Sequence, residues 1–481
     1  MKRIVILLLP LMLTPLLAFP SVDHTTATSI VKSYLAQQGL GETTLLYTLP
    51  NTVSNYTICL FDKTEYTTPN SESYVFFLDE HPLASWCHSC RYFFIDVMTG
   101  IMEMVCSSLP PLHLSEWNMF PSDNVPVWPL IQPLPSTVAL AAPLHHNMAR
   151  SNHCYAILVN GGYLNRYNHS TYWNDCSLMY RTLSQTYGYP DDHILVLFSD
   201  GTNPAEDASM GGYPVVYVNS PSDLDNDGDD DIMYPATVDC LRHVCDSLSS
   251  IITSDDFLFV YTTGHGTLSS TGVSSLCMWD STLISAPDFA YEFSKIPAGQ
   301  MLFVMDQCFG GAFIDYLSEP GRVIVTSTSA DEPSWLIGPY NYMAYYWDTA
   351  MNGCFIVDSM YYHKTPPEYA DFNQDGYVSF KEAFVHLKPS MQYQIGVQHP
   401  QYYSRKPHLG EFMTMLGNEI CSDTLVYGKT VVFSDTIYGC NVSLENVSAI
   451  NDVKLHLEAI KKVNLNNIHI HRGSVLSTEK Q

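Results

Sequence analysis

The chain has 481 residues, 46% of them hydrophobic and 15% charged, which is the composition of a globular protein of several domains rather than of a disordered or collagen-like chain. Lys and Arg total 22 against 49 Asp and Glu, a formal net charge of -27 at pH 7. A surface this acidic repels phosphate backbones and argues against nucleic acid as a partner, whereas it suits divalent cations or basic substrates. No repeat at the period of a solenoid protein is visible.

The N-terminus has the pattern of a secretory signal. Lys2 and Arg3 precede an apolar run over residues 4–17, and Ala18 lies near the expected cleavage point. No later stretch reaches about 18 uninterrupted apolar residues, so we expect a soluble mature chain without a transmembrane segment, outside the cell, in a periplasm or at a cell surface. Thirteen cysteines in an exported chain predict some disulfides, and the odd count leaves at least one thiol over.

Residues 19–108 predict a small α+β domain. Helical spacing over residues 27–38 is followed by strand-like runs, with a Gly turn between the last two that indicates a hairpin. The predicted strands are residues 57–61, 74–78, 92–97 and 101–105. Residues 109–150 are rich in proline and predict a linker or extended strap, because such a stretch sustains neither a helix nor a central strand.

Strands and helices alternate in the region 151–415. We expect helices at residues 175–187 and 237–252 and strands at residues 155–159, 194–198, 257–262, 301–305 and 323–326. This alternation predicts an α/β fold with a mostly parallel sheet covered by helices on both faces. Residues 420–481 contain short strands rich in Asn, Ser and Thr, which predict an all-β appendage, either a single sheet or a solenoid-like stack.

Two apolar strands of the α/β region end in reactive residues. The strand at 257–262 leads to His265, and the strand at 301–305 leads to Cys308. Either residue alone is more often structural, but at the same edge of a parallel sheet the imidazole raises the thiolate fraction of a nucleophilic cysteine. Backbone N–H groups of Gly266 and Cys308 are the candidates for an oxyanion site.

The region from about 152 to 350 resembles the legumain family of caspase-like cysteine peptidases. The resemblance rests on His265 followed by Gly after one strand, and on Asp306, Gln and Cys308 after the next. It implies a caspase-like fold with a His–Cys dyad and covers somewhat under half of the chain. Phe309 departs from the small or polar residue that often follows the nucleophile in this family, which leaves the substrate preference open.

The resemblance also implies roles for neighbours of the dyad. Asp306 matches a position that lines the primary specificity pocket, and a hydrogen-bonding role for this acid is an equally good interpretation. Ser334 and Trp335 match a loop that forms another wall of the pocket. In the family an Asn often supports the catalytic His, and Asn165 and Asn168 both match that position.

Two acidic loops predict calcium. The first fits the EF-hand loop, with Gly376 at its sharp turn, and a solvated loop is the alternative for both. The second alternates carboxylates but has Tyr234 where the loop's last acid is expected. The candidate ligands are Asp371, Asn373, Asp375, Tyr377, Ser379 and Glu382 in the first loop, and Asp223, Asp225, Asp227, Asp229 and Asp231 in the second. We expect structural calcium and no organic cofactor.

These patterns together predict a secreted, calcium-stabilised cysteine endopeptidase that cleaves protein or peptide substrates through a thioester acyl-enzyme. A peptide transamidase or ligase with the same dyad is the first alternative, and a non-catalytic surface-binding or adhesion protein is the second. Because residues 19–150 precede the catalytic region, they are a candidate pro-region of a zymogen. Arg150 is the only Lys or Arg between Arg91 and Arg166, which makes it a candidate processing site.

Overall fold

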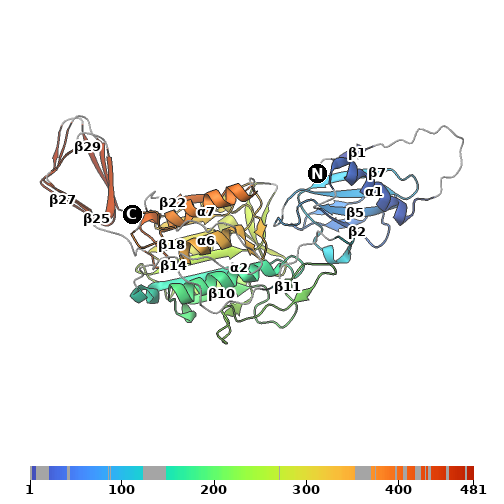
Figure 1. Cartoon of the computed structure of the whole chain (residues 1–481), viewed down its shortest axis with the longest axis horizontal. Helices are drawn as coiled ribbons and strands as arrows, with labels where there is room; N and C mark the ends of the chain where they lie inside the picture. Colours follow the sequence, from blue (N-terminus) through green and yellow to red (C-terminus); the bar gives the residue numbers. More distant parts are fainter. Residues whose placement is uncertain are drawn as a thin grey trace.

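The computed structural model describes residues 3–6, 21–40, 44–84, 86, 88–122, 130, 148–269, 271–352, 370–373, 375–395, 398–404, 409–417, 424–427, 429–431, 435–450, 454–471 and 474–480. Figure 1 shows three parts along the long axis: an N-terminal sheet with its helix, a central α/β unit and a C-terminal β unit. None of the helices within these ranges combines the length and the hydropathy that a membrane span requires.

The N-terminal part is an antiparallel sheet covered by one helix. Its strand order is β1-β7-β6-β5-β2-β8, and α1 packs Ala27 and Val31 against it. Asp23 begins α1 by accepting the Thr26 N–H, and Gly39, in the left-handed region with φ 69°, ends it. The elements are β1 (Arg3–Ile6), α1 (His24–Gln38), β2 (Leu45–Thr48), β3 (Thr57–Cys59), β4 (Glu65–Thr67), β5 (Ser73–Asp79), β6 (Cys90–Asp96), β7 (Met102–Ser107) and β8 (Asn118–Met119).

The N-terminal sheet draws strands from outside residues 19–108. β8 pairs with β2, and Leu112, Leu114 and Trp117 join the hydrophobic core of this part, so the first prolines of the predicted linker belong to the folded unit. β1 lies inside the predicted signal peptide and pairs with β7 at the edge of the sheet. Most of the predicted linker, residues 123–129 and 131–147, lies outside the described residues.

The central unit is built on a seven-stranded sheet of order β13-β10-β9-β14-β18-β19-β22. The first six strands are parallel, as predicted, whereas β22 is antiparallel to β19 and was not predicted. The strands are β9 (Cys154–Asn160), β10 (Ile194–Phe198), β13 (Ile232–Tyr234), β14 (Phe257–Thr263), β18 (Gln300–Met305), β19 (Arg322–Thr326) and β22 (Gln401–Ser404).

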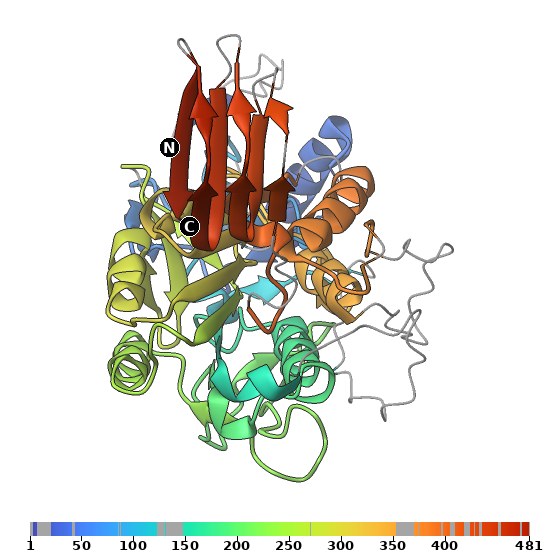
Figure 2. The same ribbon diagram turned by 90° about the vertical axis from the view of Figure 1, so that its left-hand side faces the viewer.

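Helices cover both faces of this sheet, because the central strands are apolar on both faces. Phe259 and Tyr261 of β14 join the core under α2, α6 and α7, while Leu258 and Val260 join the core under α3, α4 and α5. Figure 2 shows α6 and α7, in orange, on the opposite side from the yellow-green helices α3 and α4. The helices are α2 (Ser170–Arg181), α3 (Val238–Ser249), α4 (Ala286–Ser294), α5 (Ile314–Leu317), α6 (Tyr342–Asn352) and α7 (Phe380–Ile395).

The predicted α/β fold class, a mostly parallel sheet with helices on both faces, is therefore confirmed. Helix α2 begins five residues earlier than the predicted helix at 175–187, and a π-turn continues it over Thr182–Thr186. Smaller strands decorate the unit: β11 (Ala208–Ser209), β12 (Tyr217–Val218), β15 (Gly266–Leu268), β16 (Ser274–Met278), β17 (Thr282–Ser285), β20 (Leu336–Ile337) and β21 (Tyr340–Asn341).

The C-terminal part is a stack of β-coils with two parallel sheets, β23-β25-β27-β29 and β24-β26-β28. Side-chain hydrogen bonds join residues 21 positions apart, as between Asn446 and Asn467 and between His456 and Ser477. Of the two alternatives for this appendage, the solenoid-like stack is therefore the one found, although its coils are too few to make a visible sequence repeat. The strands are β23 (Thr424–Tyr427), β24 (Thr430–Val431), β25 (Asp435–Glu445), β26 (Ser448–Ala449), β27 (Lys454–Asn466), β28 (His469–Ile470) and β29 (Val475–Lys480).

Several cysteines of the described residues are free thiols rather than members of the predicted disulfides. Cys176 and Cys245 are buried and pack as small hydrophobic side chains, whereas Cys106 is exposed. Cys59 and Cys240 are further free thiols and are partly buried.

Candidate active site

The central sheet brings His265 and Cys308 to the same edge. β14 and β18 are neighbouring parallel strands in which Thr262 pairs with Met305, and each reactive residue comes three positions after its member of that pair. Both side chains are fully buried. The backbones touch as well, because a Cβ placed on Gly266 would lie 2.1 Å from the Cys308 carbonyl oxygen.

Two backbone groups hold the His265 ring in one tautomer. Its Nε2 lies 2.7 Å from the Tyr167 carbonyl oxygen, which only accepts, so Nε2 carries the hydrogen. Its Nδ1 accepts the Trp86 backbone N–H at 3.2 Å. Burial lowers the pKa of His265 to about 4, although the contact with Tyr167 opposes this shift. The imidazole is therefore neutral, with its lone pair on Nδ1.

Aromatic rings fix the orientation of the His265 ring. Phe61, Tyr167, His169 and Tyr172 meet it edge-on, with interplanar angles of 81°, 89°, 87° and 85° and centroid distances of 5.7, 6.2, 5.8 and 5.4 Å. Edge-to-face contacts of this kind favour one ring orientation. Phe61 comes from the N-terminal part and the other three rings from the central unit, so both parts enclose the imidazole.

A strained turn presents the Cys308 sulfur. Phe309 has φ 59°, a left-handed conformation that is rare for a bulky residue and is found mainly where function requires it. Its N–H donates to the Glu332 carbonyl oxygen at 2.9 Å. Cys308 Sγ accepts the Ser334 N–H at 3.2 Å and packs with Leu109 and Leu268. The sulfur is thus oriented by the loop that contains Ser334.

The residues predicted for the specificity pocket lie next to the sulfur. Ser334 donates through its hydroxyl to Asp306 Oδ1 at 3.3 Å, while Asp306 Oδ2 accepts the Tyr261 hydroxyl and the Ala344 N–H. Burial raises the pKa of Asp306 to about 8, although these hydrogen bonds oppose the shift. Trp335 follows Ser334 on the same loop.

The Asn residues considered as supports for His265 have other contacts. Asn168 accepts through Oδ1 from the amide of Asn160 and donates to Ser199 and to the Asp207 carbonyl oxygen. Among the described residues, no hydrogen bond joins Asn165 to the imidazole. The Tyr167 carbonyl oxygen holds His265 instead. A backbone acceptor has no residue-type signature, so sequence patterns cannot reveal it.

An unpredicted pair, Glu332 and His399, braces the loop around the sulfur. The Glu332 carboxylate accepts three hydrogen bonds. They come from His399 Nδ1 at 2.5 Å, from the His399 backbone N–H at 3.0 Å and from the Ser329 N–H at 3.1 Å. Burial alone raises the pKa of Glu332, but these hydrogen bonds hold it below its ordinary value. The Glu332 carbonyl oxygen also accepts the Phe309 N–H. The pair therefore links the segment just before β22 to the strained turn at Phe309.

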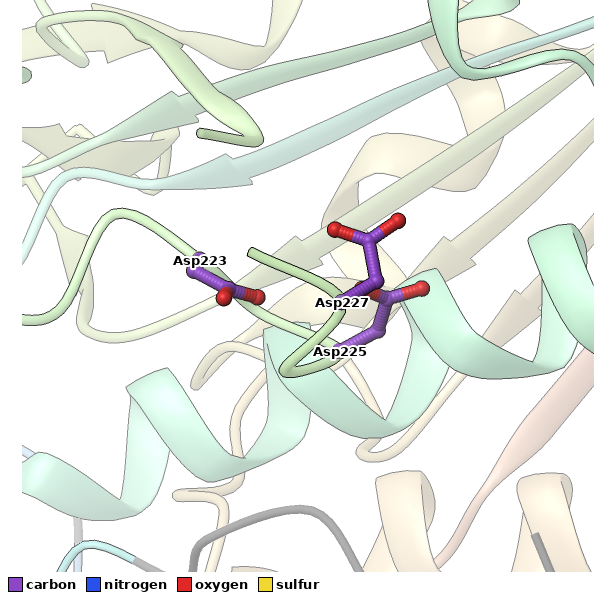
Figure 3. Close-up of side chains that lie close together, drawn as sticks. All are labelled: Asp223, Asp225 and Asp227. Atoms are coloured by element: carbon purple, nitrogen blue, oxygen red, sulfur yellow. The ribbon is translucent and has the colours of Figure 1, made fainter. Parts of the chain in front are cut away.

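Part of one predicted calcium site is assembled. Asp223, Asp225 and Asp227 offer carboxylate oxygens that all lie within 4.8 Å of one another, from a single loop (Figure 3). The buried Oδ1 of Asp225 makes no hydrogen bond to the described residues. Asp231 instead accepts the Leu224 N–H at 2.6 Å, and Asp229 is exposed.

The other predicted loop is closed by its own hydrogen bonds. Asp371 accepts the N–H groups of Asp375 and Gly376, and Glu382 accepts the N–H and hydroxyl of Ser379. Gly376 has φ 90°, the conformation that the sharp turn of an EF-hand loop requires. Its described carboxylates do not form a group as close as that of the first loop. Tyr377 and Asn373 lie in the same turn; Gln374 lies outside the described residues.

Comparison with known proteins places this arrangement in a family. The model of the Peptidase C13 family matches residues 154–395, which is half of the chain. Similar solved structures include protein GSU0716 from Geobacter sulfurreducens, with 9% identity, a TM-score of 0.33 and coverage of 52% of this chain and 92% of that chain. Caspase-1 from Spodoptera frugiperda has 13% identity, a TM-score of 0.32 and coverage of 55% and 94%. The curated proteins include no match. The resemblance inferred from the sequence is confirmed: the chain belongs to the peptidase C13 family, the legumain family of cysteine peptidases.

Proposed function

We propose that this peptidase is a secreted endopeptidase in which Cys308 is the nucleophile and His265 the general acid and base. The main support for this proposal is that the two residues follow the paired strands β14 and β18 at equivalent positions, each three residues after a member of the same pair. The tautomer supports it, because the Tyr167 carbonyl oxygen leaves Nδ1 as the basic nitrogen. Secretion rests on the charged and apolar pattern of residues 1–18.

The proposed reaction proceeds through a thioester. The Cys308 thiol gives its proton to His265 Nδ1 as sulfur attacks the scissile carbonyl carbon, and that proton then passes to the leaving amine as the C–N bond breaks. Water next attacks the thioester, its proton goes to Nδ1, and the returning proton restores the thiol as the acid product leaves. We assign the N–H groups of Cys308 and Gly266 to the negative oxygen of each tetrahedral intermediate. An amine in place of water would give the transamidase reaction.

We propose that Asp306 selects substrates by hydrogen bonding rather than by charge. Its carboxyl group is surrounded by donors from Tyr261, Ser334 and Ala344, and burial raises its pKa, which favours the neutral form. A neutral acid does not compensate the charge of a buried Lys or Arg. We therefore expect a positional peptide library to rank amide or small polar residues above basic ones before the cleaved bond; a preference for basic residues would contradict this assignment.

Replacement of the two proposed catalytic residues tests the function. Cys308→Ala and His265→Ala each remove a group that every step uses, so hydrolysis of an internally quenched peptide pool should fall by at least about a thousandfold. Cys245→Ala is the matched control, because this thiol lies on the buried face of α3, away from the site. Turnover in Cys308→Ala equal to a measurable turnover of the control, in a chain whose active site is open to substrate, would reject the assignment.

We also propose that calcium stabilises the fold at the loop of Asp223, Asp225 and Asp227. Three carboxylates this close repel one another unless a cation compensates them, and oxygen ligands suit calcium. The buried Oδ1 of Asp225, without a hydrogen bond, fits a direct ligand. The loop of Asp371 to Glu382 is the second proposed site, on the strength of its spacing and of Gly376 at the turn.

Metal removal tests the calcium proposal. Addition of calcium to chelator-treated protein should raise the melting temperature by several degrees, because an ion that binds only the native state adds to its stability. The effect of the first site should disappear in Asp223→Asn/Asp227→Asn, which retains the second loop. Identical melting curves with chelator and with calcium would contradict both sites.

A further inference from the structure

A segment of the N-terminal part meets the edge of the proposed active site through a single β-bridge that follows a turn at residues 82 and 83. Ala84 forms an antiparallel bridge with Trp335, and the Leu336 N–H donates to the Leu83 carbonyl oxygen at 3.3 Å. The ring of His81 meets that of Trp335 edge-on at 5.6 Å. Addition of an extended chain to an exposed strand edge is a general way in which proteins bind peptides. The Ser334–Leu336 edge is thus already occupied by a peptide segment of the same chain.

The same segment reaches the basic nitrogen of His265. Trp86, three residues after Leu83, donates its backbone N–H to Nδ1 at 3.2 Å. In the proposed reaction Nδ1 faces the amide nitrogen of the leaving group, so the Trp86 amide stands where that nitrogen would lie. Residue 85, between the bridge and this amide, lies outside the described residues.

The nucleophile is covered by the same part of the chain. Leu109 packs against Cys308 and Phe309, and Phe61 packs edge-on against His265. Both proposed catalytic side chains have no exposed surface in this arrangement. Phe61, Trp86 and Leu109 thus form a cover over the proposed active site. A substrate cannot reach the sulfur without movement of this cover.

The cover is held by a shared hydrophobic core and not only by the segment itself. Tyr163 and Tyr167, from the loop before α2, belong to the same buried cluster as the N-terminal residues Phe61 and Trp86. The Tyr163 hydroxyl donates to the Phe61 carbonyl oxygen at 2.6 Å, and the Tyr167 hydroxyl donates to that of Pro111. The contact therefore has the character of a stable interface.

We infer that the N-terminal part is an inhibitor carried in the same chain, whose Leu83, Ala84 and Trp86 occupy the place of a substrate beside the proposed dyad. The inference rests on the proposed function of His265 and Cys308. Peptide hydrolysis requires displacement or removal of this part.

Substitution of Leu109 tests the inference in the full chain. Leu109→Asp places a charge against Cys308 and Phe309 and should displace the cover, whereas Leu109→Val keeps the apolar contact. We expect Leu109→Asp to increase both the labelling of Cys308 by iodoacetamide and the hydrolysis of a quenched peptide pool at least tenfold over the wild type. Leu109→Val should stay within about twofold.

Hydrogen exchange shows where the variant opens. The Leu336 amide should lose protection in Leu109→Asp, while amides of β5 and β6 keep theirs and report a folded N-terminal sheet. If β5 and β6 lose protection too, Ala84→Asp provides the same comparison, because Ala84 is buried at the junction without belonging to the core of that sheet.

The outcomes separate the inference from the proposed function. A wild-type chain that labels and hydrolyses as fast as Leu109→Asp overturns the inhibitor and leaves the peptidase assignment intact. Faster labelling and an exposed Leu336 amide without any peptide hydrolysis support the cover and reject the peptidase assignment. Faster labelling with hydrolysis supports both.

Discussion

The approach of Gly266 to Cys308 leaves no room for a side chain. Because a Cβ at this position would lie 2.1 Å from the Cys308 carbonyl oxygen and 3.2 Å from Gln307 Cγ, Gly266→Ala must push the two strand ends apart. The distance between imidazole and sulfur then changes, and misplacement of reacting groups by about 1 Å costs on the order of a hundredfold in rate. We expect peptide hydrolysis, measured in the Leu109→Asp background, to fall by about that factor.

Gly272→Asn is the control for this substitution. Gly272 has φ 83°, in the region that Asn tolerates better than other residues, and no atom lies within 4 Å of a Cβ built there. Its activity should match the background within about twofold. Full activity of Gly266→Ala would mean that the close approach does not position the proposed dyad.

The raised pKa of Asp79 predicts that the free energy of unfolding depends on pH. Burial raises its pKa to about 7 from 3.8, so the folded protein retains a proton there that the unfolded chain loses. The stabilisation from this proton is complete below pH 3.8 and is lost as pH rises to 7. Asp79→Asn keeps the neutral form at every pH, so it should be progressively more stable than the wild type between pH 4 and 8, by at most about 4 kcal/mol.

Thermal unfolding of the two proteins at several pH values checks this prediction. The difference between their melting temperatures should be smallest at pH 4 and largest at pH 8. Asp79 also accepts the His81 N–H at 2.9 Å, which an amide oxygen can still accept, so the substitution preserves this contact. Melting curves that remain parallel across the pH range would show that Asp79 is ionised in the folded protein.

The sequence predicted the side chains of the site better than their surroundings. His265 and Cys308 were found because an apolar strand followed by a reactive residue is a local pattern. Tyr167 and Trp86 contact His265 through backbone atoms, and such contacts depend on how distant segments pack. The role of Glu332 was likewise hidden, since its partner lies 67 positions away.

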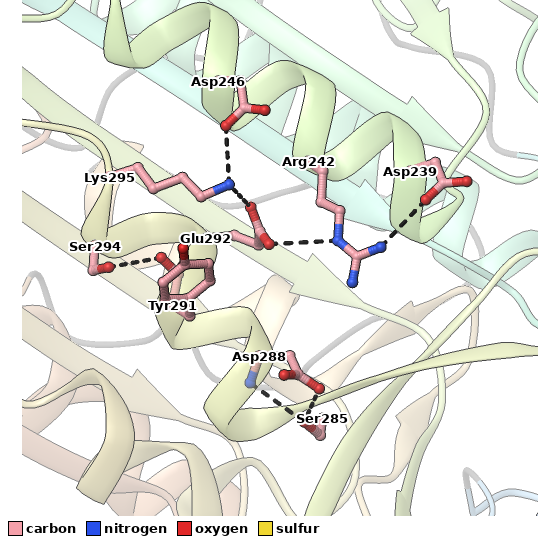
Figure 4. Close-up of polar contacts among 9 residues, drawn as sticks. All are labelled: Asp239, Arg242, Asp246, Ser285, Asp288, Tyr291, Glu292, Ser294 and Lys295. Atoms are coloured by element: carbon pink, nitrogen blue, oxygen red, sulfur yellow. Dashed lines mark hydrogen bonds and ion pairs between the residues drawn. The ribbon is translucent and has the colours of Figure 1, made fainter.

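At the scale of elements, helices α3 and α4 are joined by a buried acid. Glu292 on α4 pairs with Lys295 Nζ at 2.6 Å and with Arg242 Nε at 3.4 Å, and Lys295 also reaches Asp246 (Figure 4). The Glu292 side chain is only 5% exposed, whereas that of Asp239, which also pairs with Arg242, is 93% exposed. Loss of the buried acid therefore costs more than loss of the exposed one.

We expect Glu292→Gln to lower the free energy of unfolding by about 1–2 kcal/mol, because charge-assisted hydrogen bonds to a buried group are replaced by weaker ones. Asp239→Asn should change it by less than about 0.5 kcal/mol. Denaturant unfolding of the peptidase in both variants provides the comparison. Equal losses would show that burial of Glu292 does not strengthen its ion pairs.

Elements with strong local patterns were predicted, and those defined by pairing were not. The buried parallel strands β9, β10, β14, β18 and β19 all begin and end within about two residues of the predicted runs, since their apolar stretches are continuous. β22 and β8 are short and none of their residues is fully buried, and their pairing with β19 and β2 is set by tertiary contacts. For the same reason the N-terminal sheet continues past residue 108 into the proline-rich stretch.

At the scale of the whole molecule, the order of the three parts explains the inferred inhibition. The N-terminal sheet and the C-terminal coils lie at opposite ends of the central unit (Figure 1). The N-terminal sheet lies at the end where β14 and β18 lead into His265 and Cys308, as the contacts of Trp86 and Leu109 require. Removal of the C-terminal coils should therefore leave the cover in place, while removal of the N-terminal part should not.

Opening of the cover should change the titration of His265. Burial holds the pKa of His265 at about 4, and Phe61 and Trp86 of the N-terminal part both contact the ring. A ring exposed by loss of these contacts should titrate near its ordinary value of 6.5. The closed state then binds fewer protons than the open state between pH 6.5 and 4. Acidification through that window favours opening, by up to about 3 kcal/mol from this group.

Neighbouring groups modify this effect in both directions. His88, whose pKa burial lowers to about 3, adds to the preference for opening in acid if it too becomes exposed. Asp79, whose raised pKa favours protonation in the closed state, opposes it. His169 is enclosed beside His265, and burial also lowers its pKa, so its exposure on opening acts in the same direction as that of His265.

Magnetic resonance of isotope-labelled histidines measures this coupling directly. In the wild-type chain the His265 signal, assigned by its loss in His265→Gln, should titrate with a midpoint near pH 4, and in Leu109→Asp the midpoint should move up by about two pH units. Asp79→Asn in the wild-type chain removes the opposing carboxyl and should make opening in acid, followed by the exchange of the Leu336 amide after correction for intrinsic rates, more pronounced. An unchanged His265 midpoint in Leu109→Asp, together with an exposed Leu336 amide, would show that the central unit alone buries the imidazole and that proton uptake does not drive opening.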